Sequence, residues 1–100
     1  MIVIHATALI DPAKAGAADA AMREMMVESR KEKGCLAYTF ARDLSEAGRY
    51  WILEEWESDE ILKSHFATPH MAKFQAAMGG FGVREMKAEK FVVSSKGPIR

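Results

Sequence analysis

The segment Arg49–Trp56 reads as a strand with apolar side chains on both faces, and this limits the possible folds more than any other feature. Successive side chains of a strand point to opposite sides. Trp51 and Leu53 therefore lie on one face, and Tyr50 and Ile52 lie on the other. Both faces must be covered by other parts of the protein or by a partner, so this strand is expected inside a sheet with a layer on each side.

The rest of the chain supplies three more strands and two helical layers, separated by strong start and stop signals. Asp11-Pro12 is a typical helix start, and Gly34 is a typical helix end. Between them, one face of the helix is predicted to carry Ala17, Ala21, Met25 and Ser29. Ser58 begins a second, short helix, which Thr68-Pro69 restarts. The remaining strands are expected at 2–10, 36–42 and 83–94.

This order, β-α-β-β-α-β, predicts an α+β protein with the ferredoxin-like (split βαβ) plan, in which an antiparallel sheet carries both helical layers on one face. The chain of 100 residues is expected to form a single domain, residues 1–100. Helices on one side leave the other apolar face uncovered. The simplest cover is the sheet of a second copy, which predicts a homodimer built as a dimeric α+β barrel.

Composition excludes several classes of function. Fourteen basic and fourteen acidic side chains give no net charge, so neither nucleic acid nor an anionic membrane surface is an expected partner. No apolar run approaches the length of about 18 residues that a membrane-spanning helix needs. The single cysteine, Cys35, excludes an internal disulfide and a cysteine-based zinc site, and it fits a protein of the reducing cytoplasm.

Two histidines are candidates for chemistry. His65 follows Ile61 by four residues and Leu62 by three, so it shares the inward face of its helix with them. Its unperturbed pKa near neutrality suits a proton carrier, but a core histidine bonded to a backbone carbonyl is an equally simple interpretation. His70 lies just inside the Thr68-Pro69 helix start, where it could instead be an exposed first-turn residue.

A carboxylate and several aromatic side chains share the other candidate surface. Glu54 and Trp56 lie on the same face of their strand, among apolar neighbours where an unpaired charge is costly. An ordinary cross-strand partner for Glu54 would be Arg42, Arg49 or Arg84. Tyr38 and Phe40 share one face of the strand 36–42 and could line the same cavity, or simply pack in the core.

No metal or nucleotide site is expected. His65 and His70 are not spaced three or four residues apart on one continuous helix, because Pro69 separates them. The chain contains neither a dinucleotide-binding glycine motif nor a Walker motif.

One stretch is similar to a known family. Leu53-Glu54-Glu55-Trp56-Glu57-Ser58, followed by His65 and then Ala67-Thr68-Pro69-His70-Met71, resembles the "E-x-W … H … T-P-H" pattern of bacterial quinol monooxygenases in the antibiotic biosynthesis monooxygenase family. The turn Glu32-Lys33-Gly34-Cys35 also resembles a turn of that family.

The resemblance implies a monooxygenase that needs no cofactor and oxidises a small aromatic quinol or anthrone with O2. In this interpretation His65 removes the substrate proton, and Glu54 orients His65 or a water molecule. The substrate contacts His70 and an aromatic wall. The wall would consist of Trp56, Tyr38, Phe40 and Phe66. Relatives with this fold include isomerases and haem-degrading enzymes, and a non-catalytic barrel that binds an apolar ligand is the main alternative.

Overall fold

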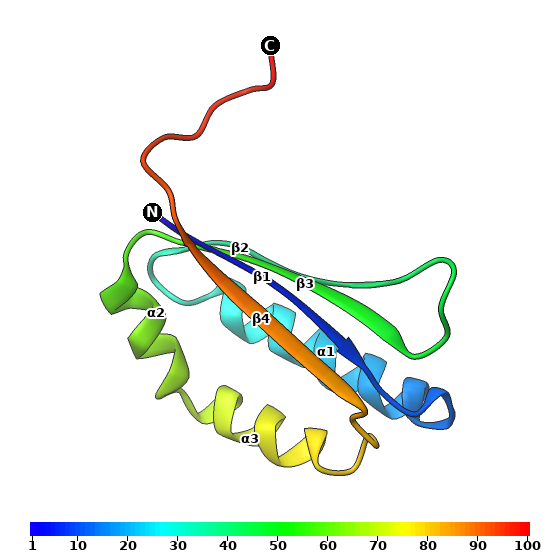
Figure 1. Cartoon of the computed structure of the whole chain (residues 1–100). Helices are drawn as coiled ribbons and strands as arrows, with labels where there is room; N and C mark the ends of the chain where they lie inside the picture. Colours follow the sequence, from blue (N-terminus) through cyan, green and yellow to red (C-terminus); the bar gives the residue numbers. More distant parts are fainter.

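The computed structural model describes residues 1–100 and confirms the predicted order of elements. The strands form one antiparallel sheet in the order β2-β3-β1-β4. Figure 1 shows this sheet with its helices, and a C-terminal tail that leaves the body beyond β4. The elements are β1 (Ile2–Leu9), the 3-10 turn η1 (Pro12–Lys14), α1 (Ala15–Arg30), β2 (Cys35–Arg42), β3 (Arg49–Trp56), α2 (Asp59–Phe66), α3 (Pro69–Met78) and β4 (Glu85–Val92).

The first helix differs from its prediction at both ends and on its buried face. It ends at Arg30, with Lys31 as its C-cap, and not at Gly34. Its first turn, Pro12–Lys14, is 3-10, and the α-helix proper begins at Ala15. The predicted buried face was partly wrong, because Ala17 is exposed and Ala21 is only half-buried. The helix buries Ala18 and Met22 in their place, together with the predicted Met25 and Ser29. The helix therefore turns a neighbouring stripe toward the sheet, which places the long Met22 side chain in the core.

The predicted caps set the position of the two short helices. The Ser58 hydroxyl accepts a hydrogen bond from the Ile61 N–H at 3.2 Å and starts α2. The Thr68 hydroxyl accepts one from the Met71 N–H at 3.3 Å, and it also donates to the carbonyl of His65 at 2.7 Å. Thr68 therefore ties the end of α2 to the start of α3, which fixes the bend between the two helices.

The core lies between the helices and one face of the sheet. Met22 of α1, Leu62 of α2 and Phe74 of α3 all join one buried cluster with Tyr50 and Trp56 of β3. Both helical layers thus pack on the same side of the sheet, as the ferredoxin-like plan requires.

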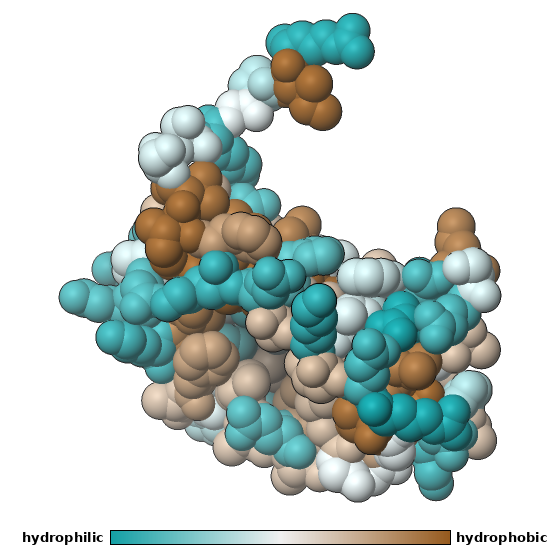
Figure 2. All heavy atoms as spheres, in the orientation of Figure 1, coloured by the Kyte–Doolittle hydropathy of each residue, from teal (hydrophilic) through white to brown (hydrophobic).

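The opposite face of the sheet stays exposed within one chain. Trp51 is 37% exposed and Leu53 is 43% exposed, and both point away from the helices. Figure 2 also shows apolar side chains gathered where the chain leaves β4, where Phe91 and Val92 are exposed. The exposed apolar face agrees with the reasoning behind the predicted homodimer, which stays a prediction. None of the helices is both long and apolar enough to cross a membrane.

Candidate functional site

A cavity of about 490 Å³ lies between the inner face of the sheet and the pair α2–α3. Its floor contains Ala6 and Ala8 of β1 and Ala88 of β4, and Ala6 lies directly opposite Ala88 in the strand pairing. The small alanine side chains leave empty space above this part of the sheet. The larger side chains of Leu62, Phe66 and Phe74 of the helices form the opposite wall of the cavity. The volume suits a small organic ligand.

Charged side chains lie at the rim of this cavity. Lys90 of β4 reaches across to α2 and pairs with Asp59 at 3.0 Å, and Lys63 lies 3.8 Å from the same carboxylate. The Lys63 side chain is mostly exposed, and those of Lys90 and Asp59 are a little under half exposed. The cavity therefore has an apolar interior and a polar entrance. Sequence reasoning missed Lys63 and Lys90, since no local pattern shows that Lys90 of β4 lies close enough to α2 to pair with Asp59.

Glu54 is the acidic group inside the cavity. Its side chain is on the inner face of β3, is only 9% exposed, and lines the cavity floor. Trp56 donates its indole N–H to Glu54 Oε1 at 3.0 Å. Burial raises the pKa of Glu54, and the hydrogen bond from Trp56 offsets only part of that rise.

None of the three arginines considered as partners for Glu54 pairs with it. Arg42 pairs with Asp19, Arg49 pairs with Glu46 and Glu85, and Arg84 lies 3.9 Å from Asp11. These pairs lie away from the cavity. The carboxyl group of Glu54 therefore has no arginine partner; it accepts a hydrogen bond from Trp56 and lines the cavity.

Tyr38 and Phe40 of β2 also line the cavity, as does Phe66 of α2. Tyr38 is buried and is directly opposite Glu54 in the strand pairing. Burial, together with the nearby charge of Glu54, raises the pKa of the Tyr38 phenol. Tyr38 therefore stays protonated, and its hydroxyl lies near Ser29 of α1.

His65, Trp56 and His70 lie outside the cavity lining, which corrects the prediction that His65 and Trp56 share one cavity with Glu54 and Tyr38. His65 is 1% exposed and packs against Trp56, with ring centroids 4.6 Å apart. Its centroid is 5.4 Å from that of Tyr38. His65 thus contacts Trp56, which is hydrogen-bonded to Glu54, and Tyr38, which is opposite Glu54 in the strand pairing.

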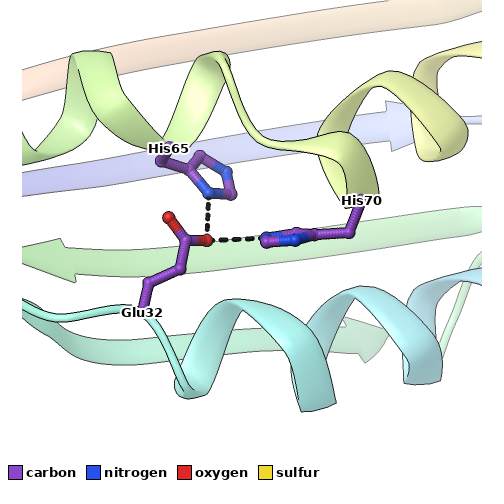
Figure 3. A group of neighbouring side chains, drawn as sticks. All are labelled: Glu32, His65 and His70. Carbon is purple, nitrogen blue, oxygen red and sulfur yellow. Dashed lines mark hydrogen bonds and ion pairs between the residues drawn. The ribbon is translucent and has the colours of Figure 1, made fainter.

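Outside the cavity lining, two histidines meet one carboxylate (Figure 3). Glu32 Oε2 lies 2.7 Å from His65 Nδ1 and 2.7 Å from His70 Nε2. The two histidines lie on separate helices, as predicted, but the bend between α2 and α3 still brings their ring centroids to 6.0 Å from each other. Sequence reasoning missed Glu32 as the partner of these histidines, since nothing local relates it to residues more than thirty positions later.

Comparison with known proteins places the chain in a family. The family profile described as antibiotic biosynthesis monooxygenase matches residues 1–77. The chain belongs to this family. A curated relative, an uncharacterized protein of Synechocystis, is 30% identical over 73 residues, which are 73% of this chain and 50% of the relative. The chain thus spans about half the length of that relative.

Several solved structures share the fold over nearly the whole chain. A candidate antibiotic biosynthesis monooxygenase from Deinococcus radiodurans is 24% identical, with a TM-score of 0.92 over 100% of this chain and 99% of that chain. One from Caulobacter crescentus is 29% identical, with a TM-score of 0.88 over 94% and 90%. A protein of unknown function from Bacteroides thetaiotaomicron, described as a possible oxidoreductase, is 29% identical, with a TM-score of 0.82 over 90% and 94%.

Proposed function

We propose that this chain is a cofactor-independent monooxygenase that oxidises a planar aromatic quinol- or anthrone-type substrate with O2 inside the cavity between the sheet and α2–α3. The observation that carries the proposal is the position of Glu54, a buried carboxyl group with a raised pKa in the floor of an otherwise apolar cavity. Family membership and neighbours named as candidate monooxygenases support the reaction class.

The substrate itself can supply all the electrons. When a hydroquinone becomes a hydroxyquinone, or an anthrone becomes an anthraquinone, the substrate loses four electrons. One oxygen atom of O2 enters the product and the other leaves as water, so no further reductant is required. The protein has to hold a flat aromatic molecule, take a proton from it and exclude bulk water.

Glu54 is the group we assign to proton removal, in place of His65. A general base must reach the proton it accepts, and Glu54 lines the cavity whereas His65 does not. Burial raises the pKa of Glu54 toward neutrality, which makes its carboxylate a stronger base than an exposed one. Tyr38, opposite Glu54 in the strand pairing, contributes an aromatic surface beside this base for the flat substrate.

His65 acts as a positioning residue in this mechanism. Its ring packs on Trp56, and Trp56 donates the hydrogen bond that orients the Glu54 carboxylate. Replacing His65 should therefore lower the rate without removing the group that titrates during turnover.

The test is O2 uptake by purified protein with a panel of benzo- and naphthohydroquinones and an anthrone, corrected for autoxidation without protein. We expect Glu54→Gln to lower kcat/KM by about 10² to 10⁴, the usual contribution of a general base. Glu55→Gln is the matched control, because Glu55 is the next residue on the strand but does not line the cavity. Its rate should stay within about twofold of the wild-type rate.

The pH dependence of kcat/KM distinguishes Glu54 from His65 as the general base. Wild-type kcat/KM should rise with pH along a limb set by Glu54, at a pH above the ordinary carboxyl value of 4.5. His65→Gln should keep that limb at a lower rate, and Glu54→Gln should lose it. If His65→Gln loses the limb and Glu54→Gln keeps it, the assignment of the base to Glu54 is wrong.

A variant that narrows the cavity tests whether the substrate binds there. Ala88→Phe adds a ring to the cavity from an exposed strand, so the fold should tolerate it while KM rises. Protein that retains a hydroquinone but takes up no O2 with any substrate would refute the enzyme and favour a ligand-binding barrel. Loss of an added haem's Soret band with reductant would instead favour haem degradation.

A further inference from the structure

We propose that Glu32, His65 and His70 form a binding site for one divalent transition-metal ion, with Zn²⁺ as the first probe. The three side chains come from the turn after α1, from the last turn of α2 and from the first turn of α3 (Figure 3). One ligand atom from each lies within 4.8 Å of the other two. None of the three lines the cavity, so this site is separate from the proposed substrate site.

The donor set matches the chemistry of zinc. Two imidazole nitrogens and one carboxylate oxygen are a common protein ligand set for Zn²⁺, which leaves the fourth tetrahedral position for water. At zinc–ligand distances of about 2.0–2.1 Å, tetrahedral ligand atoms lie about 3.3 Å from one another. The oxygen-to-nitrogen distances of 2.7 Å to both rings are shorter, so the ligands must move apart by roughly 0.6 Å to admit the ion.

The surroundings permit that small movement. His65 is held against Trp56 and is almost fully buried, so its ring is already oriented. The side chains of Glu32 and His70 are 14% and 18% exposed, which gives an ion access from solvent. Glu32 lies in a turn beyond the end of α1, where its side chain can withdraw without disturbing the helix.

A bound ion would join three elements that are otherwise connected by weaker contacts. Because α2 and α3 form one wall of the cavity, the ion would hold this wall against the end of α1. A ligand that binds only the folded state raises thermal stability in proportion to the logarithm of its concentration above Kd. Zinc should therefore raise Tm, and the rise should grow with zinc concentration.

The experiment uses the full chain after treatment with EDTA and removal of the chelator. Titration with Zn²⁺ followed by calorimetry should show one ion per chain with a Kd in the micromolar range or below, and Tm should increase. Co²⁺ should give the visible absorption bands of a tetrahedral site. Glu32→Gln and His70→Gln should each weaken Zn²⁺ binding by at least about 100-fold, since even an outer partner of a metal ligand contributes about 10- to 100-fold.

His5→Gln is the matched control. His5 is the third histidine of the chain, stacks on Trp51 at 5.5 Å and has no part in the cluster. This variant should bind Zn²⁺ as the wild type does. The two ligand variants change partly exposed side chains, so they should stay folded in the absence of metal.

Two results would overturn the metal site. Wild-type protein that binds no Zn²⁺ at micromolar concentration would leave Glu32 as a carboxylate that only hydrogen-bonds two imidazoles. Equal binding by the wild type, Glu32→Gln and His70→Gln would place any bound zinc elsewhere. Either result would leave the proposed oxygenase function untouched, because its test depends on Glu54 and the cavity.

Discussion

The two tryptophans of β3 allow a direct measurement of what burial adds to one hydrogen bond. Trp56 donates its indole N–H to Glu54 at 3.0 Å in the core, and Trp51 donates its own to Asp43 at 2.8 Å at the surface. These are the only tryptophans in the chain. Replacing each by phenylalanine removes the same donor from opposite faces of one strand, so the environment is the main variable.

The expected loss for Trp56→Phe has two parts. The buried Glu54 oxygen loses its donor, which costs about 1–3 kcal/mol. The smaller ring leaves roughly 40 Å³ unfilled, and at about 24 cal/mol per Å³ this adds about 1 kcal/mol. The free energy of unfolding should therefore fall by about 2–4 kcal/mol. In the single chain, Trp51→Phe should change it little, because Asp43 and the space left by the ring return to water.

Urea denaturation, with similar m-values for all variants, measures these differences. All variants are compared in a Leu53→Asp background, which is expected to be monomeric, so that self-association does not enter the comparison. The double variant Trp56→Phe with Glu54→Leu removes both partners of the bond and should recover most of the hydrogen-bond part. Equal losses for the two single variants, or no recovery in the double variant, would refute this account of Glu54.

Three further predictions follow from the same structure. Since burial raises the pKa of Glu54 above 4.5, the native state binds its proton more tightly than the unfolded state does, and stability falls as the pH rises from about 4.5 through the raised pKa. Glu54→Gln should thus have a higher Tm than the wild type at neutral pH, and the difference should vanish below pH 4.5; a lower Tm at neutral pH would contradict this. Gly34→Ala should lower stability by about 1–2 kcal/mol or more, because φ is +88° and the new Cβ would lie 2.7 Å from Ile61 Cγ2. Gly16→Ala, a helical position with open space, should instead raise thermal stability slightly, and equal effects would argue against backbone strain at Gly34. Sedimentation should show a homodimer at micromolar concentration that Leu53→Asp converts to monomer, whereas a wild-type monomer would remove the argument from the exposed sheet face.

The order of elements could be predicted from sequence because its signals are local. A serine or threonine before a helix, and a glycine after one, act on backbone groups within a few residues. Ser58 and Thr68 therefore begin their helices with the predicted hydrogen bonds. Gly34 has the predicted positive φ, but it lies in the turn before β2, because α1 has already ended at Arg30 with Lys31 as its C-cap. The stripe of α1 was misplaced because several alanines fit either of two neighbouring faces, and only packing against the sheet chooses between them.

The division of the candidate site into two parts was decided by tertiary structure. Spacing along a helix correctly predicted that His65 points inward, but it could not show that this ring packs against Trp56 and Tyr38 and does not line the cavity. The cavity exists because alanines of β1 and β4 meet across the strand pairing, and Glu32 reaches two histidines because α2 and α3 bend at Thr68. Such neighbours are set by how strands pair and helices pack, which depends on the whole chain and leaves no pattern in any short segment of it.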